Sequence, residues 1–288
     1  MVPGGAPSRP MVMALPDCVA INRTGTMSHT VVLPDTHMIV PKLASIEQDT
    51  HASYQSSGFL TVDTSKYGIE VYRFRKSYDT YCYPGASGRK SIVLHFLAGY
   101  LNGISWLTRE DYHVSVPFVI GRNGNIYELF DPDESWAYHL GNGTVGGNET
   151  MSRQTIGIEL ANVGQLKPKE DKLYFVTTKT SGGHTMTVWT PYCLRSETQH
   201  FDEVDYRGES FFATYTDPQY EATRRLLAAL CDKYAIPKRF LPLTKRYGVF
   251  ESGTAAANFK GIASHVNYRP SGKWDIGPGF EWAKISLS

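Results

Sequence analysis

The chain lacks the features that mark membrane proteins and nucleic-acid-binding proteins. No apolar run approaches the roughly 20 residues needed to cross a bilayer. The apolar run Met11–Leu15 stops at Pro16 and is too short for a Sec-type signal. The 29 Lys and Arg residues balance 28 Asp and Glu residues, so no net charge attracts a polyanion. We therefore expect no membrane insertion, no nucleic-acid partner, and an exit from the cytoplasm, where there is one, by a non-Sec route.

The cysteines do not form a recognisable framework. The four residues Cys18, Cys82, Cys193 and Cys231 contain no CxxC pair and no tight spacing, which excludes a cysteine-based zinc knuckle and a disulfide scaffold. Free buried thiols are the favoured interpretation, and a disulfide formed after export stays open. The zinc signature HExxH is also absent.

The N-terminal part, residues 1–65, differs in composition from the rest of the chain. It is rich in Gly, Ser and Thr and contains the prolines Pro3, Pro7, Pro10, Pro16, Pro34 and Pro41. This composition predicts an irregular extension with a short strand at Thr30–Leu33. The polar stretch Ser45–Ser57 is either a linker or a short helix.

Residues 66–288 have the pattern of an α/β domain. Expected strands are Ile69–Phe74, Ser91–Leu97, Val114–Gly121, Asn125–Phe130 and Thr155–Leu160. The nearly continuous apolar run Ser91–Leu97 suits a strand that is buried on both faces. Asn123-Gly124, between two apolar runs, predicts a hairpin.

One long helix follows these strands. Asp217 is a good N-cap, Pro218 suits the first helical position, and Pro237 ends the segment. Apolar residues recur at helical spacing between them. The whole pattern predicts a mixed central β-sheet with helices on both faces.

Residues 163–215 interrupt this scheme as an insertion. Lys172–Thr178 and Thr185–Thr190 flank Ser181-Gly182-Gly183 and predict a β-hairpin. An aromatic, acidic loop is expected to follow, with a solvated face formed by Asp202, Glu203, Asp205 and Glu209. A long insertion of this kind commonly builds a wall beside a substrate site.

A candidate metal site lies near the C-terminus. His265 and Asp275 flank a segment containing Pro, Ser and Gly, which can fold back and bring the two side chains together. Zinc accepts imidazole nitrogen and carboxylate oxygen, and a catalytic site needs a third ligand. His95, in the buried strand, is the best candidate. Taken singly, a strand histidine is more often a hydrogen-bonded core residue, and a loop aspartate is more often a turn residue.

Six segments in this order resemble the second family of N-acetylmuramoyl-L-alanine amidases, which includes phage T7 lysozyme-like enzymes, bacterial anhydromuramyl-peptide amidases and peptidoglycan recognition proteins. The segments are SIVLHFL, HVSVPFVIGRNGNIYEL, WAYHLGNG, TIGIELAN, YTDPQYEATRRLLAALCDKYAI and SHVNYRPSGKWDIGPGFEW. They span residues 66–285 apart from the insertion, and residues 1–65 match nothing.

The resemblance implies specific roles at the site. Zinc ligands would be His95, His265 and Asp275, the last position being Cys in some relatives. Glu159 falls on the catalytic glutamate of the anhydro-type enzymes, and Lys273 falls on the catalytic lysine.

Further positions are less directly implied. Trp136, His139 and Asn142 match a loop that lines the substrate cleft in the family. Val116 and Pro117 stand where phage-type relatives have a tyrosine and a histidine, which makes Glu159 the main candidate base.

The expected function is zinc-dependent hydrolysis of the amide between N-acetylmuramic acid and L-alanine in peptidoglycan or a muropeptide. A lytic enzyme, made in the cytoplasm and acting on the cell wall after non-Sec release or delivery, is favoured because residues 1–65 and 163–215 exceed what a compact enzyme needs. The alternatives are a non-catalytic peptidoglycan receptor and a cytoplasmic recycling amidase. A delivery or immunity partner is not identified by the sequence.

Overall fold

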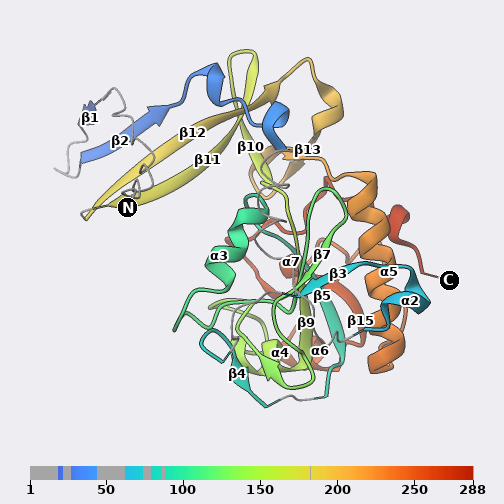
Figure 1. The fold of residues 1–288 in the computed structure, drawn as a ribbon. Helices are drawn as coiled ribbons and strands as arrows, with labels where there is room; N and C mark the ends of the chain where they lie inside the picture. Colours follow the sequence, from blue (N-terminus) through green and yellow to red (C-terminus); the bar gives the residue numbers. More distant parts are fainter. Residues whose placement is uncertain are drawn as a thin grey trace, which may run out of the picture.

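The computed structural model describes residues 19–21, 27–43, 62–73, 79–85, 88–181 and 183–287. In this part of the chain a six-stranded sheet forms the centre, in the order β15-β5-β9-β6-β7-β3 (Figure 1). Its strands are β3 (Val71–Arg73), β5 (Ser91–Phe96), β6 (Phe118–Ile120), β7 (Ile126–Glu128), β9 (Thr155–Leu160) and β15 (Gly261–Ser264). The pair β6 and β7 is antiparallel and the other neighbours are parallel, so the sheet is mixed, as predicted.

The predicted hairpin connects β6 and β7. Gly124, in its turn, has a φ of +87°, and a Cβ there would lie 2.9 Å from the carbonyl oxygen of Pro218, so only glycine fits. The strand expected over Val114–Gly121 is reduced to Phe118–Ile120. Pro117 has no N–H to donate to a ladder, and Val114 instead forms a bridge with Tyr138.

The helix α5 (Asp217–Tyr234) covers one face of this sheet. Its N-cap is Thr216 rather than the expected Asp217. The Thr216 hydroxyl accepts from the Gln219 N–H at 3.3 Å, and Gln219 Oε1 accepts from the Thr216 N–H at 3.2 Å. This reciprocal capping box satisfies two donors at the helix start, whereas an Asp217 cap would satisfy one.

Alternate residues of the central strands point to opposite faces. Ile92, Leu94, Ile156 and Ile158 join the α5 leucines in one core. The other face is covered by short helices: α3 (Ile104–Leu107), α4 (Asn148–Gln154), α6 (Gly253–Asn258) and α7 (His265–Tyr268). Helices therefore lie on both faces, as predicted.

Smaller elements complete this domain. The helix α2 (Thr64–Tyr67) contacts α5, and the strands β4 (Tyr83–Pro84) and β8 (Ser135–Trp136) form a separate pair. Single 3-10 turns lie at Asp35–His37, Val40–Lys42, Leu101–Gly103, Thr198–His200 and Trp282–Ile285. No helix of the described residues is long and apolar enough to cross a membrane.

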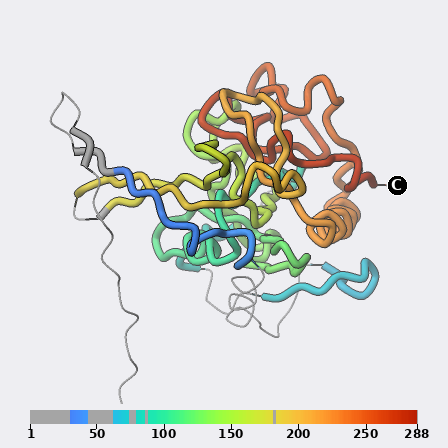
Figure 2. The backbone as a smooth tube through the Cα atoms, turned by 90° about the horizontal axis from the view of Figure 1, so that it is seen from above, coloured from blue at the N-terminus to red at the C-terminus, as the bar shows by residue number. Residues whose placement is uncertain are grey.

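The insertion and the N-terminal part build a second sheet together. Its strands, within the described residues, are β1 (Val19–Ile21), β2 (Met27–Val32), β10 (Gln165–Lys169), β11 (Lys172–Ser181), β12 (His184–Leu194), β13 (Phe201–Tyr206) and β14 (Glu209–Ala213). The predicted hairpin is β11–β12. The strand expected at Thr30–Leu33 is β2, which pairs with β12 in parallel. This sheet extends away from the central domain (Figures 1 and 2).

The prediction of an acidic loop is wrong, because these residues form the hairpin β13–β14. Arg207 and Gly208 make its turn with φ values of +49° and +80°. Phe211 and Phe212 are buried, and their packing holds the segment as a strand. The expected solvated face is found at Asp202, Glu203 and Asp205, which are exposed.

The described cysteines agree with the thiol interpretation. Cys82, Cys193 and Cys231 are buried and form no disulfide among the described residues, and burial raises the pKa of all three. Cys18 and the segment Ser45–Ser57 lie outside the described residues.

Candidate active site and metal centre

The site is built on the sheet face opposite α5. His95, near the end of β5, is the register partner of Glu159 in the parallel strand β9. Register partners of neighbouring strands present their side chains to the same face. The parallel pairing of two buried strands therefore places the expected metal ligand beside the expected base.

The second histidine is placed by the strand on the other side of β5. The strand β15 ends at Ser264, which caps α7 in a capping box with Asn267, and His265 is the first residue of that helix. After the turn at 269–274, the Val266 N–H donates to the Asp275 carbonyl at 2.9 Å. This bond brings Asp275 back beside His265, as the Pro, Ser and Gly content of the loop predicted.

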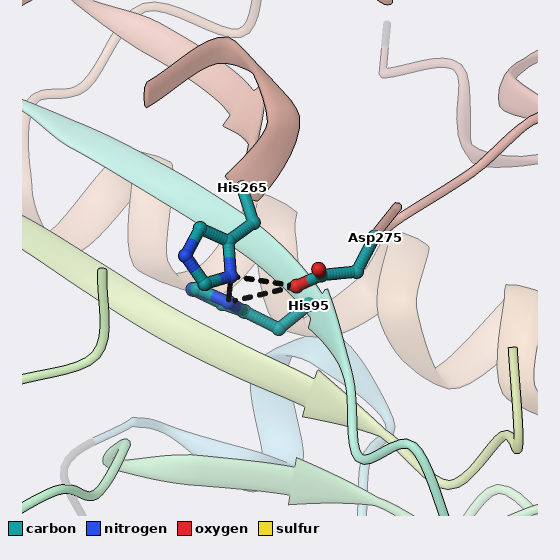
Figure 3. Close-up of side chains that lie close together, drawn as sticks. All are labelled: His95, His265 and Asp275. Carbon is teal, nitrogen blue, oxygen red and sulfur yellow. Dashed lines mark hydrogen bonds and ion pairs between the residues drawn. The ribbon is translucent and has the colours of Figure 1, made fainter. Parts of the chain in front are cut away.

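Figure 3 shows that the side chains of His95, His265 and Asp275 converge. The Nδ1 atoms of the two histidines are 2.9 Å apart, and Asp275 Oδ2 lies 2.7 Å from His265 Nδ1 and 3.2 Å from His95 Nδ1. The residues are 1%, 2% and 4% exposed respectively. Within the described residues, this is the group of His, Cys, Asp and Glu side chains that could hold a metal ion.

The protonation states of the group suit metal binding. Burial, together with the nearby His265, lowers the pKa of His95 to about 4. Burial alone would raise the pKa of Asp275, but its close contacts with His265 and His95 outweigh it and hold that pKa well below its ordinary value. A neutral imidazole and an ionised carboxylate are the forms in which these groups ligate metals.

A chain of hydrogen bonds fixes the tautomer of His95. The Thr155 hydroxyl donates its one proton to the Met151 carbonyl at 2.8 Å, so it can only accept from His139 Nε2, at 2.8 Å. Burial lowers the pKa of His139 well below its ordinary value, so the neutral ring has a bare Nδ1. That atom accepts from His95 Nε2 at 3.0 Å. Neutral His95 is thereby left with its lone pair on Nδ1.

The tautomer of His265 is fixed separately. Its Nε2 lies 2.8 Å from the carbonyl oxygen of Leu140, which can only accept, so the free lone pair is again on Nδ1. Two imidazole nitrogens and a carboxylate oxygen, each oriented by an outer partner, form a donor set that zinc accepts. The residues present therefore fit a zinc ion.

Glu159 lies in an environment that disfavours its charged form. Burial and, to a smaller extent, the charge of Asp275 raise its pKa to about 8, although Lys273 opposes the shift. Its Oε2 is buried and, among the described residues, has no hydrogen-bond partner. A carboxylate of this kind takes up a proton readily near neutral pH.

A cleft of about 520 Å³ opens beside the metal group. It is lined by Val114, Tyr138, His139, Gly141, Asn142, Asn148, Glu149, His265 and Lys273. Of the residues expected to contact substrate, Asn142 lies in this wall. His139 also lies there, but both of its ring nitrogens are bonded to protein.

Trp136, the third expected contact, is not part of the cleft lining. It is 3% exposed, its ring stacks on Tyr83 at 4.8 Å, and the Arg153 guanidinium lies 4.1 Å from its centroid. It therefore packs the β4–β8 pair.

Two further residues of the site, Thr155 and Glu149, were not among the expected ones. Thr155 could have been found from the alternation of TIGIEL, because Thr155, Gly157 and Glu159 share one face of β9. Nothing in the sequence singles out Glu149, which reaches the cleft because α4 lies beside it.

Comparison with known proteins finds a family match for the chain. A profile of the family described as N-acetylmuramoyl-L-alanine amidase (Amidase_2) matches residues 86–278, about two thirds of the 288 residues. This range contains all three candidate metal ligands, Glu159 and Lys273. No curated protein matches the chain.

Two solved structures are similar at low identity. A crystal structure of a selenomethionine derivative of AmpD is 18% identical and has a TM-score of 0.39, covering 80% of this chain and 96% of that chain. The N-acetylmuramoyl-L-alanine amidase LysC from Clostridium intestinale is 12% identical with a TM-score of 0.37, covering 75% of this chain and 94% of that chain. The assignment rests on the family match. The chain belongs to the N-acetylmuramoyl-L-alanine amidase family and is a hydrolase that acts on an amide bond of peptidoglycan.

Proposed function

We propose that the protein is a zinc-dependent amidase that cleaves the bond between the lactyl group of N-acetylmuramic acid and the L-alanine of the stem peptide. The observation that carries the proposal is the convergence of His95 Nδ1, His265 Nδ1 and Asp275 Oδ2 beside a cleft whose wall includes His265. Zinc bound by these atoms would lower the pKa of water to about 7 and polarise the substrate carbonyl.

Glu159 is the general base in this proposal. Its Oε2 has no protein partner among the described residues, so it is free to accept the proton of the attacking water. The same burial that raises its pKa to about 8 makes the protonated form accessible near neutral pH. Glu159 can then return that proton to the departing amine of L-alanine.

Lys273 supplies a positive charge in the cleft wall. As the carbonyl carbon becomes tetrahedral, negative charge develops on its oxygen. A fixed ammonium near that oxygen stabilises it, and one such interaction is often worth about 3 kcal/mol.

We further propose that the natural substrate is the intact wall. The large second sheet, formed by β1, β2 and the insertion, extends away from the central domain. A soluble muropeptide needs only the cleft, whereas a polymeric substrate can use the additional surface. This points to a lytic role rather than to recycling.

The test is product analysis with purified sacculi and with soluble muropeptides. Zinc-loaded protein should release stem peptide with a free L-alanine amine, and Glu159→Gln should abolish the release. Glu203→Gln, which changes an exposed glutamate of β13, is the matched control and should retain full activity. Unchanged substrates in the presence of stoichiometric zinc would contradict the proposed activity. Faster cleavage of muropeptides than of sacculi would contradict the lytic role alone.

A further inference from the structure

The turn of the insertion hairpin contacts the loop that carries Lys273 and Asp275. Arg207, between β13 and β14, donates through Nη1 to the carbonyl oxygen of Lys273 at 2.7 Å and to that of Arg269 at 3.0 Å. Its Nη2 donates to the carbonyl oxygen of Val266 at 3.3 Å. One guanidinium thus bonds three carbonyls of the segment between the metal ligands His265 and Asp275.

A second contact runs in the opposite direction. The indole N–H of Trp274 donates to the carbonyl oxygen of Arg207 at 3.2 Å. Trp274 lies between Lys273 and Asp275 in the sequence, so the hairpin turn is bonded on both sides of the lysine. The positive φ of Arg207, +49°, belongs to the backbone geometry that makes this tight turn.

The loop has little regular structure of its own. From Arg269 to Trp274 it forms no helix or strand, so its position depends on side-chain contacts. Arg269, within it, donates to the Leu140 carbonyl at 3.1 Å, which is the carbonyl that also contacts His265. The other side of the loop is held by Arg207.

We propose that Arg207 is a positioning residue for the metal centre, and that the hairpin β13–β14 serves to hold the loop that delivers Lys273 and Asp275. This inference rests on the zinc site of the proposed function. Arginine suits the task because its planar guanidinium presents several N–H groups in a fixed geometry. Lysine keeps the charge but cannot bond three carbonyls in these directions. Arg207→Lys should therefore retain only part of the effect of Arg207 on the position of the loop.

The experiment measures the rate at which zinc passes from the loaded protein to a chromophoric chelator. Arg207→Met should lose zinc about tenfold faster than the native protein, the usual size of an outer-partner effect on a metal site, and Arg207→Lys should lie between them. Thermal unfolding of the metal-free proteins separates this effect from a general loss of stability.

Arg239→Met is the matched control. Arg239 also bonds a backbone carbonyl, that of Lys260 at 2.7 Å, and lies over an aromatic ring, as Arg207 does over Tyr206. The control should release zinc at the native rate. Equal rates for Arg207→Met and native protein would overturn the inference, whereas failure of the native protein to take up zinc would instead overturn the proposed function.

A milder variant covers the case in which Arg207→Met does not fold. Trp274→Phe removes the N–H that bonds the Arg207 carbonyl and keeps an aromatic ring at this position. It should accelerate zinc loss by about twofold to threefold, a smaller effect because one of several contacts is removed. A native rate in a folded Trp274→Phe protein would then count against the inference.

Discussion

His139 Nδ1 lies 3.0 Å from His95 Nε2, and this contact decides which nitrogen of His95 faces the metal group. The direction of this hydrogen bond is set by Thr155, which contacts the other nitrogen of His139. The Thr155 hydroxyl donates its proton to the Met151 carbonyl and can therefore only accept from His139. A buried polar chain of this kind is useful only when every member is satisfied. This arrangement and the burial of Glu159 allow predictions for three substitutions, at Thr155, Gly157 and Glu159.

Thr155→Val should weaken zinc binding. The valine has no oxygen to accept from His139 Nε2, so the proton on that ring is no longer fixed and His95 loses its defined partner. We expect zinc affinity to fall about tenfold, measured by competition with a chelator of known affinity.

Thr223→Val is the matched control for that change. Thr223 is likewise fully buried and donates to the carbonyl four residues earlier, that of Gln219 at 2.6 Å, but it lies in α5 on the other face of the sheet. It should lose similar stability and keep native zinc affinity. Equal zinc affinities for the two variants would show that the hydrogen-bond chain does not orient His95.

Gly157→Ala should disturb the same contact by crowding. A Cβ at Gly157 would lie 3.1 Å from His139 Nδ1 and 2.6 Å from Val116 Cγ1. Both distances are shorter than a normal van der Waals contact. We expect a destabilisation of about 1–3 kcal/mol together with weaker zinc binding, measured by urea unfolding and chelator competition.

Gly103→Ala provides the comparison, because its new Cβ would meet Leu97 only at 3.6 Å, an ordinary contact. It should leave zinc affinity unchanged. If Gly157→Ala also kept native affinity, displacement of His139 would be tolerated and the contact would not matter.

Glu159→Gln should change how the stability of the metal-free protein depends on pH. The pKa of Glu159 in the folded protein, about 8, lies above its ordinary value of 4.5, so the folded state holds this proton more tightly than the unfolded state. Folding is therefore favoured most below pH 4.5, and this contribution is lost as the pH rises through about 8. Glutamine stays neutral and avoids the loss.

Urea unfolding at pH 5 and at pH 9 checks this. The Gln variant should match the native protein at pH 5 and exceed its free energy of unfolding by a few kcal/mol at pH 9, given about 1.4 kcal/mol for each pKa unit. A constant difference at both pH values would mean that Glu159 titrates normally in the folded protein.

Much of the central domain could be predicted from the sequence because its signals are local. The apolar run of β5, the Asn123-Gly124 turn and the periodicity of α5 each reflect the immediate environment of the chain. The convergence of the three candidate metal ligands was also predictable, since His95 is a polar residue in an apolar strand and the loop between His265 and Asp275 cannot continue as a helix.

The parts that were missed depend on contacts between distant segments. The acidic stretch around Asp202 has the composition of a loop, and it becomes a strand because it pairs with β14, which the buried Phe211 and Phe212 hold in place. Trp136 belongs to a motif that predicts contact with substrate in the cleft, but Tyr83 and Arg153 cover its ring. The role of Arg207 depends on a contact between the hairpin turn and the loop that carries Lys273. The two segments are far apart in the sequence, and no pattern in the sequence predicts that they touch.

Asp275→Cys should preserve the metal centre, whereas Asp275→Ala should not. A thiolate is a good zinc ligand with a bond of about 2.3 Å, against about 2.0–2.2 Å for a carboxylate oxygen, so the shorter side chain of cysteine is partly offset by the longer bond. Alanine leaves two histidines, one fewer protein ligand than catalytic zinc sites use. Zinc content after gel filtration should be near stoichiometric for native protein and Asp275→Cys and near zero for Asp275→Ala. Asp202→Ala, at an exposed carboxylate of β13, should retain full zinc. Retention of zinc by Asp275→Ala would mean that Asp275 orients the histidines without binding the metal itself.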